Sequence, residues 1–277
     1  MIVDNVMTDH PSWQIANDAA VRCVRSDNSI WMITCESTPG GRQRVGYQQL
    51  CGDGPPPQWT KFDCRRLGGE SALGREMRAM KTVVRWRNAD LWDALATSII
   101  RQVIRAAHAR RLYWAACQEF GTVFPTGHGE IALFPDPQTI LGLADGELNR
   151  TGLSFKKAAL RAAAQAYLDS AERWKALPPK ELVDALTAVH RVGEWTARAT
   201  VADYSNDFSL YPYGDLAVRT WVAAMDGDTP WPTTDAAFAA TWENLAATEL
   251  STWTVSTLAF GARHGRIAAS RAGTRAG

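Results

Sequence analysis

Residues 181–221 constrain the fold of this chain more than any other part of the sequence. Apolar residues at Leu182, Leu186 and Val189 recur at spacings of four and then three, which places them on one face of a helix. A turn is expected at residues 191–193, and a second helix follows it. Two helices joined by so short a turn pack against each other as a helical hairpin.

The turn also has the features of an anion-binding site. Gly193 is expected to let the backbone approach a ligand closely, and a positive φ there would make the position intolerant of a side chain. The amides that open the second helix from Glu194 have no partner within the helix, and they lie at the positive end of its dipole. A phosphate group fits such a position.

An aromatic loop follows the second helix and ends at an acid. Residues 211–215 read Tyr-Pro-Tyr-Gly-Asp, and Asp215 is expected to open a third helix. An aspartate at a helix start is usually a helix cap. Its position behind a hairpin and an aromatic loop also favours a catalytic role, and the two roles are compatible.

At these residues the chain resembles the helix-hairpin-helix DNA glycosylases, and within them most closely the 3-methyladenine DNA glycosylase II branch. In the hairpin the matching residues are Val189, Val192, Gly193, Trp195, Thr196 and Ala197. After the hairpin the match continues over residues 211–216 and at Arg219. The chain differs at two positions, with Arg191 where the family has its first hairpin glycine and with Glu194 before the tryptophan.

The resemblance extends over residues 88–222. Residues 98–107 resemble the family segment whose side chain fills the gap left in the duplex, and this gives Gln102 that role. The other interpretation of Gln102 is a polar residue on the surface of an amphipathic helix. Residues 134–158 also follow the family order and are expected to serve as scaffold.

The resemblance implies that Asp215 is the catalytic residue. Breaking an N-glycosidic bond develops positive charge on the sugar, and a preorganised carboxylate stabilises that charge and orients water. Strand-cutting members of the superfamily carry a lysine nucleophile where this chain has Trp195. The resemblance therefore implies hydrolysis without cleavage of the strand.

Two groups of residues are expected to contact DNA. The DNA backbone is expected to bind at Arg191, Val192, Gly193 and Thr196. An extruded base is expected to lie against Trp195, with Tyr211 and Tyr213 as alternative walls and Ala199 widening the pocket. The other interpretation of Trp195 is packing in the core.

The expected function is that of a monofunctional DNA glycosylase, which flips a damaged or modified base out of the duplex and hydrolyses its glycosidic bond. Alkylated purines are the expected substrates. Arg191, Glu194 and Ala199 keep open a glycosylase for a bulky adduct or another modified base. A non-catalytic DNA-binding hairpin is a further alternative, which Asp215 disfavours because such a module has no use for an acid after an aromatic loop.

Composition narrows the partners only locally. The net charge of +1 hides basic clusters, of which one comprises Arg101, Arg105, Arg110 and Arg111. The five cysteines form no Cys-x-x-Cys pair, so we expect no metal and no other cofactor. No apolar run approaches the roughly 18 residues of a membrane span, and no signal pattern opens the chain. We expect a monomeric, cytoplasmic, nucleoid-associated protein of bacterial type, with double-stranded DNA as its partner.

The expected fold class is mainly α, with a helical glycosylase fold preceded by a small mixed α+β domain. The N-terminal domain is expected over residues 1–85 and the helical region over residues 86–277. Within the helical region, we expect the hairpin at about residues 182–204 and the catalytic loop at residues 205–219.

Two local expectations complete the sequence-based picture. Asp90 is expected to cap one long helix that ends before Gly121, because apolar residues keep a spacing of three to four through Val103. Residues 271–277 are expected to be disordered.

Overall fold

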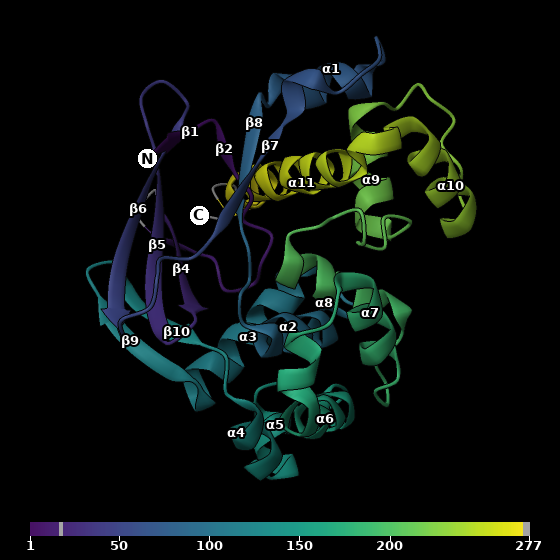
Figure 1. Ribbon diagram of the computed structural model, residues 1–277. Coiled ribbons are helices and arrows are strands. Elements are labelled where there is room, and N and C mark those ends of the chain that lie inside the picture. The colour runs from purple at the N-terminus through teal and green to yellow at the C-terminus, as the bar shows by residue number, and fades with distance from the viewer. Residues whose placement is uncertain (17–18, 274–277) are drawn as a thin grey trace.

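A layer of antiparallel strands lies beside a larger body of helices in the computed structural model, which describes residues 1–16 and 19–273 (Figure 1). The five-stranded sheet has the order β1-β6-β5-β4-β3. Its strands are β1 (Ile2–Val3), β3 (Gln14–Ala16), β4 (Ala19–Ser26), β5 (Ser29–Ser37) and β6 (Gln43–Cys51). A three-stranded sheet of order β2-β8-β7 lies next to it, with β2 (Asn5–Val6), β7 (Trp59–Asp63) and β8 (Thr82–Trp86).

The helical body divides around two apolar clusters. The first is built on α2 (Leu91–Arg101), α3 (Ala106–Phe120), α4 (Pro137–Gly142), α5 (Asp145–Arg150), α6 (Lys157–Lys175) and α7 (Pro179–Thr187). The second is built on α1 (Ala72–Ala79), α9 (Leu216–Met225), α10 (Asp235–Ala246) and α11 (Leu250–Gly273). Helix α8 (Glu194–Ser205) contributes buried residues to both clusters, so the second helix of the hairpin joins the two halves.

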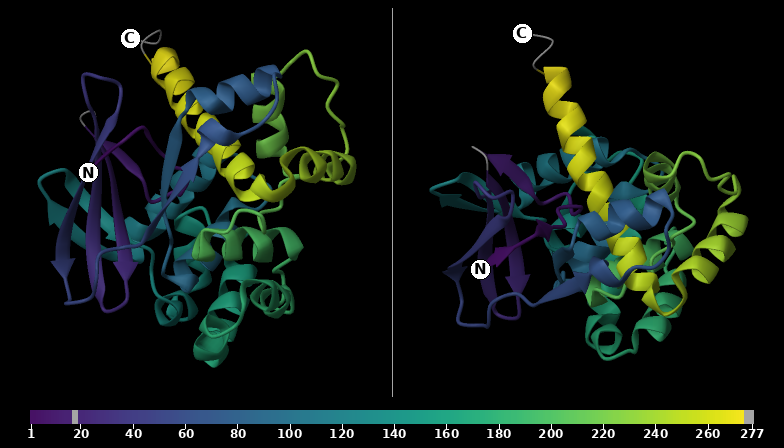
Figure 2. Two further views of the ribbon diagram at one scale, coloured as in Figure 1. Left: turned by 45° about the horizontal axis from the view of Figure 1, so that its top comes forward. Right: turned by 90° about the horizontal axis from the view of Figure 1, so that it is seen from above.

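Two segments from the helical part of the sequence pack on the strand layer. The hairpin of β9 (Thr122–Thr126) and β10 (Gly129–Leu133) places Ile131 and Leu133 against the apolar face of β4. Helix α11 contacts β7 and β8, and its C-terminal end projects beyond the other elements (Figure 2). The strand layer is therefore completed by residues far from the N-terminal segment.

The helix expected from Asp90 to the residue before Gly121 is not continuous, and this prediction was wrong. Asp90 does cap α2, since its carboxylate accepts hydrogen bonds from the amides of Trp92 and Asp93. The chain then breaks over residues 102–105, where Val103 has a φ of +57°. The left-handed conformation ends the helix although the apolar spacing continues through Val103.

The end of the chain is helical further than the sequence predicted. Residues 271–273, expected to be disordered, belong to α11, whereas residues 274–277, Arg275 among them, lie outside the described residues. Within residues 1–16 and 19–273, no helix is both long enough and apolar enough to cross a bilayer.

Candidate active site

The hairpin between α7 and α8 forms as predicted, but its left-handed residue differs from the expected one. Arg191 has a φ of +65°, whereas Gly193 has a φ of −82° and a ψ of 174°. A positive φ, the condition under which a side chain at Gly193 would strain the turn, is therefore not met. Arg191 adopts the strained conformation at the position where the resembled family has glycine.

Gly193 instead leaves open space in front of α8. A Cβ added to this residue would meet no atom within 4 Å. Gly193 is the N-cap of α8 and no side chain caps the helix, so the first hydrogen bond of the helix runs from the Ala197 amide to the Gly193 carbonyl. The amides of the first turn therefore point into open space, as an anion-binding site requires.

The side chains around this turn fall into two classes. Val192 and Thr196 are buried, so their side chains are not available to a ligand. Arg191 and Glu194 are exposed. The Glu194 carboxylate lies 3.4 Å from the guanidinium of Arg198, which leaves the negative charge beside the open amides.

Gln102 connects the break after α2 to the hairpin. Its Nε2 donates to Oγ1 of Thr196 at 2.8 Å and to the carbonyl of Arg191 at 3.3 Å. Its own carbonyl accepts from Nζ of Lys156 at 2.6 Å. The two bonds from Nε2 hold the Gln102 side chain against the hairpin, where it stabilises the turn at residues 191–193.

Two exposed apolar side chains that the sequence analysis missed belong to residues next to Gln102 and Lys156 in the chain. Val103 follows Gln102 and is 103% exposed, and Phe155 precedes Lys156 and is 96% exposed. Such exposure of large apolar side chains is unfavourable in water. For Val103 a signal was available, because it is an apolar residue inside the segment 98–107. The helical periodicity placed it on a buried face instead.

Asp215 occupies the start of α9 without capping it. It is the N-cap residue, yet its side chain accepts no hydrogen bond from the amides of α9. Its Oδ2 instead accepts a hydrogen bond from the hydroxyl of Tyr211 at 3.2 Å. The carboxylate is partly exposed, so the interpretation of Asp215 as only a helix cap does not match its contacts.

The loop that carries Asp215 is fastened on several sides. Tyr211 is buried and stacks on Phe208, with ring centroids 5.7 Å apart. Burial raises the pKa of Tyr211, so its hydroxyl stays protonated and able to donate. From α8, Nε of Arg198 donates to the carbonyl of Leu210 at 2.9 Å.

The second half of the loop packs against α10. The hydroxyl of Tyr213 donates to the carboxylate of Glu243, which commits this tyrosine to the α10 side. A Cβ on Gly214 would lie 2.8 Å from the carbonyl oxygen of Asp235, so only glycine fits there. Arg219 closes the same region through an ion pair with Asp235 at 2.9 Å.

The remaining residues expected at the base, Trp195 and Ala199, both belong to the region of the second cluster. Trp195 is partly buried and packs against that cluster, so it combines core packing with some exposed surface. Ala199 is only 4% exposed and lies inside the cluster. Ala199 is therefore too buried to contribute to the surface of the site.

A buried network of charges lies behind the site, and the sequence analysis missed it. Nε2 of His10 lies 3.2 Å from Asp93, and Arg85 contacts both Asp9 and Asp203. Burial alone would raise the pKa of Asp203, but Arg85 and His10 hold it below its usual range. The network joins the strand layer to α2 and α8.

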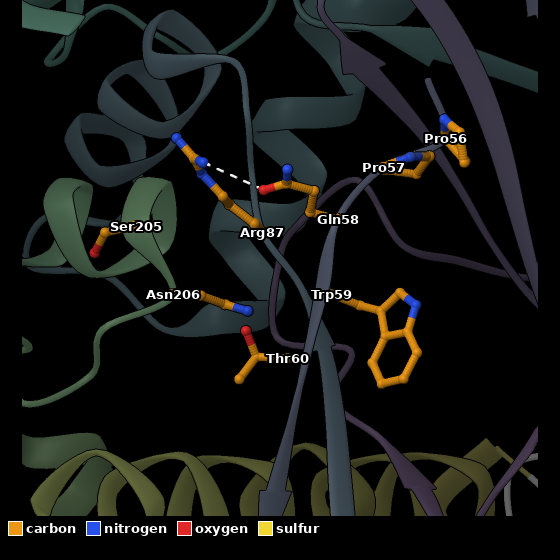
Figure 3. Close-up of a pocket in the computed structure, with 8 residues that line it drawn as sticks. All are labelled: Pro56, Pro57, Gln58, Trp59, Thr60, Arg87, Ser205 and Asn206. Carbon is orange, nitrogen blue, oxygen red and sulfur yellow. Dashed lines mark hydrogen bonds between the residues drawn. The ribbon is translucent and has the colours of Figure 1, made fainter. Parts of the chain in front are cut away.

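A separate depression lies on another part of the surface. Figure 3 shows its lining residues, which come from the loop before β7, from β7, from the segment after β8 and from the end of α8: Pro56, Pro57, Gln58, Trp59, Thr60, Arg87, Ser205 and Asn206. No residue expected to bind DNA or to act in catalysis lines it. The candidate chemistry is instead at the open face shared by α2, the hairpin and the Asp215 loop.

Comparison with solved structures identifies the fold as that of the helix-hairpin-helix DNA glycosylases. The 3-methyladenine DNA glycosylase of Archaeoglobus fulgidus superposes with a TM-score of 0.67 at 16% identity, over 95% of this chain and 93% of that one. The structure of MBOgg1 with a low-affinity DNA ligand has a TM-score of 0.66 at 15% identity, covering 95% and 93%.

A third structure comes from another kind of glycosylase. The Clostridium acetobutylicum 8-oxoguanine glycosylase/lyase, in complex with double-stranded DNA, has a TM-score of 0.64 at 13% identity, covering 94% of this chain and all 100% of that one. No family model and no curated protein matches the sequence. Structures named for different bases fit about equally well, so the fold does not choose a branch.

Proposed function

We propose that this protein is a DNA glycosylase that extrudes a damaged or modified base and hydrolyses its N-glycosidic bond. The observation that carries the proposal is the state of Asp215. Its carboxylate stands behind a helical hairpin, makes no cap and is oriented by Tyr211 at 3.2 Å. A carboxylate held in this way stabilises positive charge on a sugar as the base departs, and it orients the water that replaces the base.

The hairpin supplies the means of holding DNA. The uncapped amides at the start of α8 and the exposed guanidinium of Arg191 suit a phosphate of the backbone. Gly193 supports this role by leaving room for the phosphate to approach. Such contacts are independent of sequence and weaken with salt.

Val103 and Phe155 supply the means of opening the duplex. Extruding a nucleotide costs a few kcal/mol, and apolar side chains that enter the base stack offset part of that cost. Val103 and Phe155 are both exposed, and the residues next to them in the chain, Gln102 and Lys156, are joined by a hydrogen bond. We assign the gap-filling role to Val103, with Gln102 bracing it from behind.

Hydrolysis without strand cleavage is part of the proposal. Trp195 is the second residue of α8 and stands where strand-cutting members of the resembled superfamily carry the lysine that forms a Schiff base. Lys156 is held at the carbonyl of Gln102 at 2.6 Å, which supports a structural use of its amine. The product is then an intact strand with an abasic site.

The test is a panel of duplexes that each carry one lesion: an alkylated purine, a deaminated base, 8-oxoguanine or a bulky adduct. Release of a base with strand scission only after hot alkali supports the proposal. Borohydride trapping of a protein–DNA adduct would contradict the monofunctional mechanism. Binding to every duplex without release of any base would favour the alternative of a non-catalytic DNA-binding module.

A further inference from the structure

The two tyrosines expected as walls for the base are used inside the protein. Tyr211 is 2% exposed and Tyr213 is 5% exposed, and both belong to the second apolar cluster. Tyr211 stacks on Phe208, and the hydroxyl of Tyr213 donates to Glu243. With so little of either ring exposed, neither can stack on an extruded base. Trp195, which packs against the same cluster and is partly exposed, is the one of the three expected aromatic walls that keeps a surface for a ligand.

The polar side chains that link α8 to the Asp215 loop are bonded within the protein. Nε of Arg198 donates to the carbonyl of Leu210 at 2.9 Å, and its Nη1 lies 3.4 Å from the carboxylate of Glu194. The hydroxyl of Tyr211 donates to Asp215 at 3.2 Å. An enzyme that reads the edge of a small base needs donors and acceptors that are free to meet it. These contacts therefore favour selection of the substrate by apolar surface.

Apolar surface is exposed directly beside the candidate catalytic acid. Leu216 follows Asp215, is the first residue of α9 and is 66% exposed. Consecutive Cα atoms are about 3.8 Å apart, so Leu216 lies within reach of a nucleotide whose sugar meets the Asp215 carboxylate. One exposed leucine is ordinary on a protein surface, but its place beside Asp215 puts this one where the substrate binds. A ligand that covers it removes apolar surface from water, which is favourable.

A small lesion makes poor use of such a surface. A methylated or oxidised base has nearly the apolar area of an undamaged one, so stacking on Trp195 distinguishes the two only weakly. A base that carries an aromatic or hydrocarbon group brings additional apolar area, which Trp195 and Leu216 can cover. The exposed surface therefore discriminates a bulky lesion from normal DNA better than a small one.

We propose that the substrate of this site is a purine carrying a bulky apolar adduct, which Trp195 and Leu216 cover while Asp215 supports departure of the base. This inference rests on the proposed glycosylase function. The reaction is the same hydrolysis: the bond between the sugar C1′ and the purine nitrogen breaks, and its electron pair leaves with the base. A water oxygen bonds to C1′ and gives up one proton. With guanine substituted at N7, the cationic base departs neutral.

The experiment compares duplexes that carry N7-benzylguanine or N7-methylguanine at the same position. Both bases carry the same charge and leave through the same bond, so the ratio of their single-turnover release rates reports the added apolar group once uncatalysed loss is subtracted. The wild-type protein should release the benzyl base at least about tenfold faster, the effect of burying one aromatic group. Equal or slower release of the benzyl base overturns the proposal.

Variants at Leu216 test whether the protein, and not easier extrusion of the bulky base, sets this ratio. Leu216→Gln keeps the length of the side chain and should lower the ratio of benzyl to methyl release by about fivefold or more, whereas Leu216→Met should keep most of it. Leu168→Gln is the matched control, because Leu168 is an exposed leucine of α6 in the other half of the helical body. Thermal melting establishes that each variant is folded. A ratio that Leu216→Gln leaves unchanged, or that Leu168→Gln lowers equally, overturns the proposal.

The outcomes also separate this inference from the function beneath it. If release of some lesion depends on Asp215 but the benzyl base has no advantage, only the assignment of a bulky substrate fails. If no lesion is released by the wild-type protein, or if Asp215→Asn releases bases equally well, the glycosylase proposal fails and the assignment of a bulky substrate fails with it.

Discussion

Replacing Val103 with glycine should make the protein more stable and less active. Val103 holds a φ of +57° and its side chain is 103% exposed, so the substitution relieves strain and removes no packing. A left-handed conformation costs an L-residue about 1–2 kcal/mol. The extra freedom of glycine in the unfolded chain returns about 0.5–1 kcal/mol of this. The net gain is about 0.5–1 kcal/mol.

That gain is small but measurable. The entropy of unfolding is about 2 cal/mol/K per residue, so for 277 residues the melting temperature should rise by about 1–2 °C. Base release should fall by about tenfold or more, because burying a valine side chain in the base stack is worth about 1.5 kcal/mol or more. Val103→Leu keeps an apolar side chain and should retain most of the activity.

Differential scanning calorimetry and single-turnover base release measure the two effects on the same samples. If Val103 served only the fold, its replacement by glycine would lower the stability of the protein. A fall of several degrees in melting temperature, or unchanged base release by a folded Val103→Gly variant, refutes the assignment of Val103 as the side chain that enters the duplex.

Two further predictions concern the hairpin. Glu194→Gln should tighten binding to damaged and undamaged duplexes alike by about two- to fivefold at low salt, because the substitution removes a negative charge from the phosphate site at the start of α8. The measurement is a titration at low and at high salt. A variant that binds no better, or whose gain persists at high salt, would contradict the placement of the phosphate. Gly193→Ala should leave the melting temperature within about 1 °C, because a φ of −82° suits any residue, and should weaken binding to both duplexes by filling the space in front of the amides. Unchanged affinity would show that DNA is held elsewhere.

The sequence predicted the parts of the fold that rest on local rules. The hairpin and the start of α2 after Asp90 follow from periodicity and capping. The approach failed where a residue other than glycine takes a left-handed conformation. Val103 carries no sequence signal for a positive φ, so the periodicity predicted one helix across the break. At Arg191 the only signal was the glycine that the resembled family has at this position.

The contacts that complete the site are long-range, and periodicity contains no information on them. Helix α2 packs on α8, and Arg198 of α8 holds the Asp215 loop through the carbonyl of Leu210. The network around His10 depends on the strand layer docking against α2 and α8. The β9–β10 hairpin was also missed. Gly127 and Gly129 do mark its turn, but the sequence does not show that it packs on β4, which lies far away along the chain.

The central claim is that the Asp215 carboxylate supports departure of the base. The most direct measurement is single-turnover release by Asp215→Asn on the lesion that the wild-type protein processes fastest, together with the affinity of both proteins for that duplex. The amide keeps the size of the side chain but cannot offset charge on the sugar. Release should fall by at least about a hundredfold while the affinity changes little. Release near the wild-type rate by a folded variant would contradict the account.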